Sequence, residues 1–253
     1  MAPSALPDTL DGWLAHIERG HPQSIAMGLD RVRVVRNSMA LVPPSTMTIF
    51  TVGGTNGKGS ACMMLESILQ HAGYKTACYT SPHLLRYNER VRIARSAADD
   101  ASLVRAFAAV EAARAKVDVP LTYFEFGTLA AMALFVEAKV DVAILEVGLG
   151  GRLDAVNVFE PDCALVMSVA LDHMEYLGDT REKIGFEKAG IFRAGKPAIY
   201  AEADPPQSLL THAASIGARL LLRGRDFDIK QAANHWGYQG PGGARHEIGR
   251  AHV

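Results

Sequence analysis

A glycine-rich segment with one lysine is the part of this sequence best suited to bind phosphate. Residues 53–60 read Gly-Gly-Thr-Asn-Gly-Lys-Gly-Ser, after a short β-rich run and before a helical pattern. Glycines let several backbone N–H groups converge on one phosphate, and the start of the following helix adds partial positive charge. Lys58 can reach the β- and γ-phosphates, and the Ser60 hydroxyl can help to hold Mg²⁺. The predicted nucleotide site consists of Gly54, Thr55, Asn56, Gly57, Lys58, Gly59 and Ser60.

The match to the common phosphate-loop pattern is incomplete. Val52 stands where that pattern has its first glycine, and Gly59 separates Lys58 from Ser60. A plain strand-to-helix glycine turn is the alternative interpretation. The lysine, the hydroxyl and the flanking elements together favour phosphate binding over that alternative.

The segments around this loop alternate between strand-like and helix-like patterns. The apolar run at 140–147 is typical of a strand that is buried on both faces of a parallel sheet. The alternation predicts an α/β fold, with a mostly parallel sheet flanked by helices. The predicted strands span 47–52, 74–79, 140–147, 163–169 and 197–200. The predicted helices span 60–73, 99–116, 124–137, 180–189 and 206–216, after an amphipathic helical segment at 6–41.

Seven further segments resemble, in the expected order, segments of one known family. They are Met27–Val32, Thr80–Leu84, Asn88–Val91, Leu121–Phe126, Leu145–Asp154, Ala170–His173 and Glu187–Ile191. Together with the phosphate loop they resemble the Mur ligase superfamily, and specifically folylpolyglutamate synthase/dihydrofolate synthase of the bifunctional bacterial type. The resemblance covers nearly all of residues 10–222. It implies a P-loop NTPase-like fold, that of the central domain of Mur ligases.

The resemblance also implies an ATP-dependent ligase that forms an amide. In that family ATP phosphorylates a carboxylate, and the amino group of L-glutamate then displaces phosphate from the acyl phosphate. The expected substrates are dihydropteroate or tetrahydrofolate together with L-glutamate, and the expected cofactors are ATP and Mg²⁺. Charge on the transferred phosphoryl group needs cations, which Mg²⁺ and Lys58 would supply.

By the same resemblance, Mg²⁺ is expected to bind Ser60, Ser81, Glu146 and His173. The last three follow three successive predicted strands, so they can converge at one edge of a parallel sheet. A buried Glu146 without a cation would be costly, and a solvated strand-end carboxylate is the alternative. Lys188 resembles the lysine that the family carboxylates to a carbamate, whereas an exposed helix lysine is the alternative. Lys58, His173 and Lys188 are therefore the candidate catalytic residues.

A pterin or pteroate pocket is implied by three of the matched segments. Aromatic rings can stack on the pterin, and carboxylates can pair with its guanidine-like edge. The alternative is that Tyr123 and Phe124 are core aromatics at the start of a helix. The expected pocket residues are Gly28, Leu29, Asp30, Arg31, Tyr123, Phe124, Glu125, Arg152, Leu153 and Asp154.

Composition narrows the partners. The chain has 253 residues and a formal net charge of −1, so nothing attracts it as a whole to nucleic acid or to an anionic membrane. Three scattered cysteines favour a reducing compartment over a disulfide framework. No signal-peptide pattern starts the chain, and the apolar stretch at 128–136 is too short to span a bilayer. These features predict a cytoplasmic monomer that acts on small molecules.

The expected domain organisation is a helical segment at 1–42, an ATP-binding domain at 43–225, and the start of a connection at 226–253. No counterpart of the family's second-domain DxAHNP-type segment is found, so that C-terminal domain is expected to be missing. One codon choice for residues 248–253 spells the start of a sequencing adapter, so these six residues are expected to be an artefact of sequencing. A genuine polar tail is the alternative.

Three other functions stay open at this point. The chain could be a nucleotide- and Mg²⁺-binding fragment without ligase activity, another Mur-type amide ligase, or a regulatory NTPase. The segments at 27–32 and 121–126 argue against a ligase for cell-wall precursors. The lack of an Asn-Lys-x-Asp segment disfavours a GTPase.

Overall fold

An eight-stranded sheet forms the centre of the molecule. The computed structural model describes residues 6–21, 25–231 and 235–249, and the sheet has the order β4-β3-β2-β5-β1-β6-β7-β8. Strands β2, β5, β1, β6, β7 and β8 are all parallel, and β3 and β4 add an antiparallel edge. The strands are β1 (Thr48–Gly53), β2 (Thr76–Tyr79), β3 (Val91–Ile93), β4 (Ser96–Ala97), β5 (Val142–Glu146), β6 (Cys163–Val166), β7 (Pro197–Tyr200) and β8 (Arg219–Leu222). The predicted mostly parallel sheet flanked by helices is confirmed.

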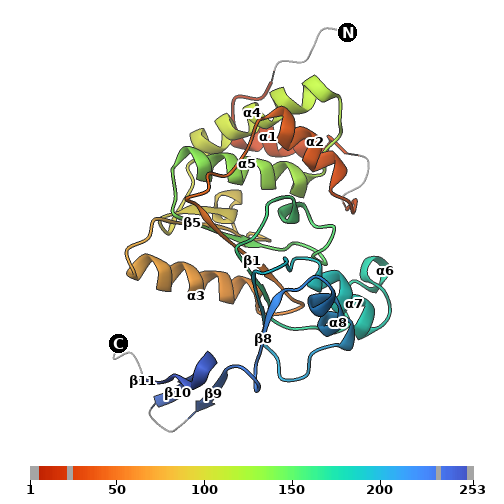
Figure 1. The fold of residues 1–253 in the computed structure, drawn as a ribbon. Coiled ribbons are helices and arrows are strands. Elements are labelled where there is room, and N and C mark those ends of the chain that lie inside the picture. The colour runs from red at the N-terminus through yellow and green to blue at the C-terminus, as the bar shows by residue number, and fades with distance from the viewer. Residues whose placement is uncertain (1–5, 22–24, 232–234, 250–253) are drawn as a thin grey trace.

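Helices cover both faces of this sheet. The helices are α1 (Leu10–Glu18), α2 (Asp30–Ser38), α3 (Lys58–His71), α4 (Asp100–Val117), α5 (Tyr123–Glu137), α6 (Met174–Leu177), α7 (Arg181–Ala189) and α8 (Gln207–Ser215). Figure 1 shows α1, α2, α4 and α5 grouped on one side of β1 and β5, and α3 on the other side. Short 3-10 helices are η1 (Tyr87–Arg90), η2 (Ala155–Val158) and η3 (Pro241–Gly243). None of the described helices is long and apolar enough to cross a membrane.

Strand β5 shows why the central strands read as continuous apolar runs. All five of its residues are buried, and successive side chains point to opposite faces. Val142 and Ile144 pack under α3 with Cys62 and Cys78, whereas Ala143 and Leu145 belong to the larger core under α5. The strand therefore ends with Glu146 already enclosed by protein on both sides.

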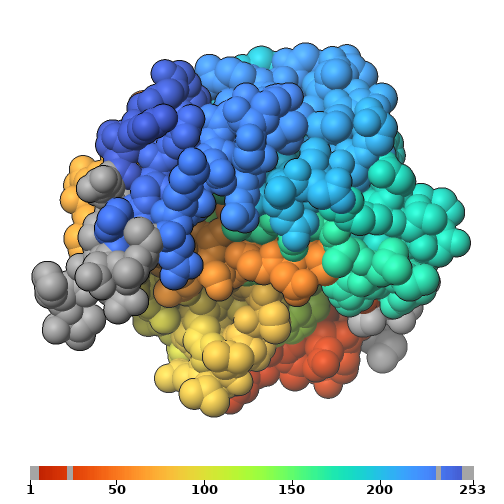
Figure 2. Space-filling model, turned by 90° about the horizontal axis from the view of Figure 1, so that it is seen from below, coloured from red at the N-terminus to blue at the C-terminus, as the bar shows by residue number. Residues whose placement is uncertain are grey.

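The C-terminal part differs from the sequence prediction. The segment at 226–253 was expected only as the start of a connection, without strands of its own, but β9 (Asp228–Gln231), β10 (His235–Gln239) and β11 (Arg245–Gly249) form an antiparallel sheet. Glycines inside β10 and in the turn obscured the alternation that marks a strand. In the view from below, this dark blue sheet lies next to the lighter blue surface that precedes it in the chain (Figure 2). Residues 250–253, part of the predicted tail, lie outside the described residues.

Candidate active site

The glycine-rich loop after β1 is pinned to the segment that follows β6. The backbone N–H of Thr55 donates to the Ser168 carbonyl (2.9 Å), and the N–H of Asn56 donates to Ser168 Oγ (2.8 Å). Gly54 has φ +140°, and a Cβ there would lie 3.0 Å from backbone and side-chain atoms of Met167. Only glycine fits this close approach, so the loop is held in one shape before any ligand binds.

Helix α3 begins directly at the lysine of this loop. Gly57, with φ +82°, lies just before Lys58 and lets the chain turn into the helix. Lys58 Nζ donates to the carbonyl oxygens of Gly54 (2.9 Å) and Thr55 (3.1 Å). The ammonium group therefore lies over the loop, next to the helix N-terminus, where both charges favour an anion.

Glu146 lies at the carboxyl end of β5, beside the first turn of α3. A Cβ at Gly59 would be 3.7 Å from Glu146 Oε1, so the missing side chain leaves space next to the carboxylate. The carboxylate is 4% exposed, and its Oε2 accepts the backbone N–H of Ser81 (3.0 Å). Burial raises the pKa of Glu146, while the Ser81 N–H and the charges of Lys58 and Arg92 oppose that rise. Among the described residues, Oε1 has no hydrogen-bond partner, which leaves it available to a cation.

His173 reaches the same region from the segment after β6. Its backbone is left-handed (φ +46°), and its Nε2 lies 3.8 Å from Asp172 Oδ1. It lines one cavity together with Lys58 and Ser81, so three predicted site residues meet there. The described residues contain no group of three or more His, Cys, Asp or Glu side chains placed to hold a metal. A cation here would need hydroxyl and phosphate oxygens in addition to any of these side chains.

Lys188, in the last turn of α7, is buried rather than solvent-exposed. It is 4% exposed and lines a small cavity with Gly54, Lys58 and His173. Burial and the charge of Lys58 lower the pKa of Lys188 to about 8, although Asp172 and Asp154 act in the opposite direction. At neutral pH an appreciable fraction of this amine is thus uncharged and nucleophilic, unlike that of an ordinary helix lysine.

A cavity of about 410 Å³ extends from Lys58 and Ser81 between α5 and the loop after β5. Of the predicted pocket residues, Phe124, Glu125, Leu153 and Asp154 line it. Tyr123 lines a second cavity of about 600 Å³ instead. The pocket prediction therefore divides between two neighbouring spaces.

The two carboxylates that line the 410 Å³ cavity, Glu125 and Asp154, already have hydrogen-bond partners. Glu125 accepts the Thr122 N–H (2.8 Å) and pairs with Arg31 (2.8 Å), so it closes the N-terminal capping box of α5. Asp154 accepts the N–H groups of Leu149 (2.8 Å) and Val156 (3.0 Å). Burial raises the pKa of Asp154 to about 7 despite these N–H groups. Both residues shape the cavity wall as well as face it.

The remaining predicted pocket residues lie outside the lining of the 410 Å³ cavity. Gly28 and Leu29 lead into α2, and Gly28 donates its N–H to the Leu153 carbonyl (3.3 Å). The Asp30 side chain is 99% exposed and pairs with Arg33. Arg152 pairs with Glu187 (2.8 Å), away from the cavity. These motif residues therefore support the structure around the cavity, and they do not line it themselves.

Arg90 was not assigned a role from sequence, although it lies within a matched segment. It lines both cavities, and its guanidinium carbon is 5.5 Å from the ring centroids of Tyr87 and Tyr123. Its Nε donates to His83 Nδ1 (2.8 Å). The sequence holds no signal for this placement, because the two rings come from separate parts of the chain.

The match to a known protein family spans most of the site residues described above. The family described as the Mur ligase middle domain matches residues 52–234, which include the glycine-rich loop, Glu146, His173 and Lys188. The chain belongs to the Mur ligase family. Its segments matched that family in order, and the parallel sheet with a glycine-rich loop at its centre agrees with the match.

Within the Mur ligases, the chain is similar to dihydrofolate synthase/folylpolyglutamate synthase. It is 48% identical to that enzyme of Escherichia coli (strain K12) over 229 residues, which cover 90% of this chain and 54% of the enzyme. It also resembles the structure of E. coli FolC in complex with DHPP and ADP, with a TM-score of 0.92 and 45% identity over 96% of this chain and 58% of that one.

A second solved Mur ligase gives the same picture. A bifunctional folylpolyglutamate synthase/dihydrofolate synthase with Mn, AMPPNP and L-glutamate bound has a TM-score of 0.88 and 48% identity. The match covers 97% of this chain and 58% of that structure. The chain thus spans about half the length of the curated relatives it matches.

Proposed function

We propose that this chain binds Mg²⁺-ATP at the glycine-rich loop and serves an ATP-dependent ligase that adds L-glutamate to a folate-type carboxylate. The acceptor is dihydropteroate, the glutamate tail of tetrahydrofolate, or both. One observation carries the proposal: Lys58, Ser81 and His173 line the end of a cavity that can hold an organic acid. The ADP, AMPPNP, Mn and L-glutamate bound by the similar enzymes support the same ligand classes.

The phosphate-binding role rests on the loop and on Lys58. Backbone N–H groups of residues 54–60 and the start of α3 would hold the phosphates, and Lys58 would turn from its two carbonyl partners toward them. Ser60, Ser81, Glu146 and His173 are the proposed Mg²⁺ ligands, and the free Glu146 Oε1 fits that role. When bound, Mg²⁺ would supply positive charge beside the β- and γ-phosphates.

The cavity would orient the acceptor carboxylate. Phe124 would offer an aromatic ring to a pterin, and Leu153 and Ala155 would offer further apolar contacts. A carboxylate oxygen then attacks the γ-phosphorus and ADP leaves, which gives an acyl phosphate. The glutamate amine attacks the acyl carbon, loses a proton, and releases inorganic phosphate as the amide forms. Positioning and fixed charge carry both steps.

Lys188 is proposed to carry a carbamate. An uncharged lysine amine adds to CO₂ and releases one proton, and the product is an anion in place of a cation. The lowered pKa of about 8 makes the required uncharged amine available near neutrality. Such an anion beside Lys58 and His173 would offset their positive charge and help to orient the metal site.

Two further expectations stay as proposals. Residues 1–42 and 43–225 would form one ATP-binding unit, which the shared core of α1, α2, α4 and α5 supports. We also propose that the protein acts as a cytoplasmic monomer, in keeping with three free cysteines of which two are buried. Light scattering coupled to size exclusion tests the monomer, and a stable dimer would contradict it.

The function is tested by binding and by transfer. The chain should bind Mg²⁺-ATP and dihydropteroate in calorimetry. Lys58→Met should weaken the binding of Mg²⁺-ATP but not that of dihydropteroate. With ATP, Mg²⁺ and labelled L-glutamate, the expected product is dihydropteroate carrying one glutamyl residue. Failure to bind both ligands would overturn the proposal, and binding without transfer would restrict this chain to the binding steps.

A further inference from the structure

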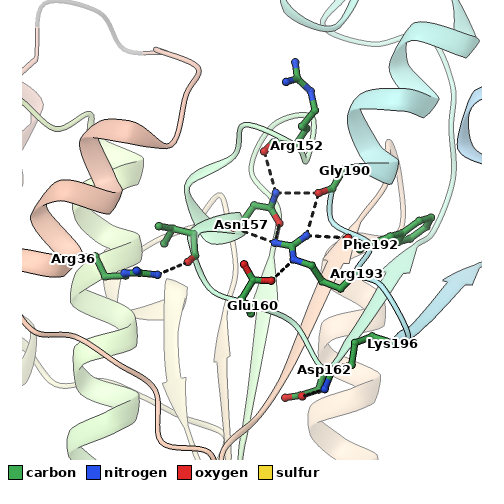
Figure 3. Close-up of polar contacts among 10 residues, drawn as sticks. Arg36, Arg152, Asn157, Glu160, Asp162, Gly190, Phe192, Arg193 and Lys196 are labelled. Carbon is green, nitrogen blue, oxygen red and sulfur yellow. Dashed lines mark hydrogen bonds and ion pairs between the residues drawn. The ribbon is translucent and has the colours of Figure 1, made fainter. Parts of the chain in front are cut away.

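A hydrogen-bonded clasp joins the loop after β5 to the end of helix α7 (Figure 3). Its centre is Asn157, a buried side chain in η2. Asn157 Nδ2 donates to the carbonyl oxygens of Arg152 (3.0 Å) and Gly190 (3.1 Å). One amide group thus bridges two segments that are more than thirty residues apart in the chain.

Arg193 fixes the orientation of this amide. Its Nη2 donates to Asn157 Oδ1 (2.9 Å), and its Nη1 donates to the carbonyl oxygens of Gly190 (3.2 Å) and Phe192 (3.0 Å). Glu160 pairs with the outer side of the guanidinium. Because the guanidinium only donates, Oδ1 must face it and Nδ2 must face the two carbonyls.

The two clasped segments are also in direct contact. The Arg152 N–H donates to the Glu187 carbonyl (2.8 Å). A Cβ on Gly151 would lie 2.8 Å from that carbonyl oxygen, and one on Gly190 would lie 2.4 Å from Arg152 Cβ. The segments therefore have no room to slide past each other without breaking the clasp.

The clasp connects two parts of the site. Leu153, Asp154 and Ala155 of the first segment line the 410 Å³ cavity, and Lys188 lies two residues before Gly190 in the second. We infer that Asn157 is a positioning residue, which keeps the cavity wall and the Lys188-bearing turn of α7 at a fixed separation. The role in ligand binding rests on the proposed function, whereas the mechanical coupling of the two segments does not.

Asn157→Asp is the most informative substitution. It keeps the shape and the Oδ1 acceptor for Arg193, but it removes both N–H donors and places an oxygen against two carbonyls. Amide hydrogen exchange in residues 149–155 and 187–191 should then become at least about tenfold faster, while β1 and α3 stay unchanged. Arg193→Lys should speed exchange in the same two segments to a smaller degree, because lysine keeps the positive charge but lacks the planar guanidinium that donates to several oxygens at once.

A matched control comes from the same view of the molecule. Lys196→Gln removes an exposed ion pair with Asp162 (2.9 Å) near the clasp and should leave exchange in both segments unchanged. Unchanged exchange in Asn157→Asp would overturn the inference. Equally faster exchange in β1 and α3 would also overturn it, because the residue would then support only global stability.

Ligand binding adds a second readout. In Asn157→Asp, the Kd for dihydropteroate should rise by about tenfold while the Kd for Mg²⁺-ATP changes by less than about twofold, since the glycine-rich loop is held by Ser168 instead. Equal weakening of both ligands would contradict a positioning role. If the unaltered chain binds no dihydropteroate, the proposed function fails, and the exchange result alone decides the clasp.

Discussion

Two buried carboxylates, one at the end of β5 and one in the loop after it, have different surroundings. Glu146 and Asp154 are each 4% exposed. Asp154 uses both oxygens on backbone N–H groups of Leu149 and Val156, and so it closes the loop around itself. Glu146 uses one oxygen on the Ser81 N–H and keeps the other beside the space left by Gly59.

This difference separates a carboxylate that builds the site from one that can serve a ligand. Burial raises the pKa of both groups, and Lys58 counters the rise at both. Backbone N–H groups satisfy Asp154 within its own loop, whereas one oxygen of Glu146 has no hydrogen-bond partner in the part of the chain that the structure describes. The comparison predicts that cation binding requires Glu146, and that the conformation of the loop after β5 requires Asp154.

Removing the positive charge of Lys58, which acts on both carboxylates, should have the largest effect. Lys58→Met should weaken Mg²⁺-ATP binding by roughly 100-fold, because a charged contact to phosphate is lost in a partly enclosed site. Calorimetry with and without Mg²⁺ measures this loss. Lys183→Met is the matched control, since that lysine is exposed on α7 and forms an ion pair with the exposed Asp179. Equal effects of the two substitutions would contradict a special role for Lys58.

Asp154 should make stability depend on pH. Its pKa is raised from 3.8 to about 7 in the folded chain, so the folded state binds the extra proton between these values. Stability should therefore fall by about 2 to 4 kcal/mol as pH rises through this window, and then level off. Urea unfolding at several pH values measures the fall, which should be smaller by this amount in Asp154→Asn, where Glu146 still titrates with a raised pKa. A parallel pH dependence in both proteins would show that Asp154 stays ionised.

Lys188 sharpens the comparison, because both Lys58 and Asp154 act on it. Reaction with acetic anhydride should show a midpoint near pH 8, where the pKa lies, and Lys58→Met should move that midpoint upward. Mass spectrometry of the Lys188 peptide gives the rate at each pH. A midpoint near the ordinary value of 10.5 would contradict the burial argument.

Ser81→Ala should have the smallest effect on the structure. The contact to Glu146 uses the backbone N–H of Ser81, which alanine keeps. Loss of the hydroxyl as a proposed metal ligand should then weaken Mn²⁺ binding by only about threefold to tenfold. A loss as large as that of a Glu146 substitution would mean that the hydroxyl matters as much as the carboxylate, and would contradict this ranking.

Local patterns predicted much of this fold. The continuous apolar run at 140–147 and the glycine-rich loop are short-range signals, so β5, β1 and α3 were predicted within a few residues. The strands β9 to β11 were missed, because β9 has only four residues and glycines lie within β10 and at the end of β11. Strands β3 and β4 were also missed, since three- and two-residue strands leave little pattern.

Long-range contacts limited the prediction of the site. The pairing of Arg31 with Glu125 joins residues 94 positions apart, and no local pattern reports that Glu125 is already engaged. Lys188 is buried where α7 packs against the loop that Asn157 clasps, and this packing joins segments far apart in the chain. The segment containing Asp30 matched a motif, but its exposed side chain shows that a motif can mark a corner of the fold.

Manganese binding in the presence of a non-hydrolysable ATP analogue tests the central claim most directly. Electron paramagnetic resonance would compare the unaltered chain with Glu146→Gln and Asp154→Asn. Glu146→Gln should weaken Mn²⁺ binding by roughly 100-fold, whereas Asp154→Asn should change it by less than about threefold. Equal losses in the two variants, or no loss in Glu146→Gln, would contradict the assignment of the cation site to the end of β5.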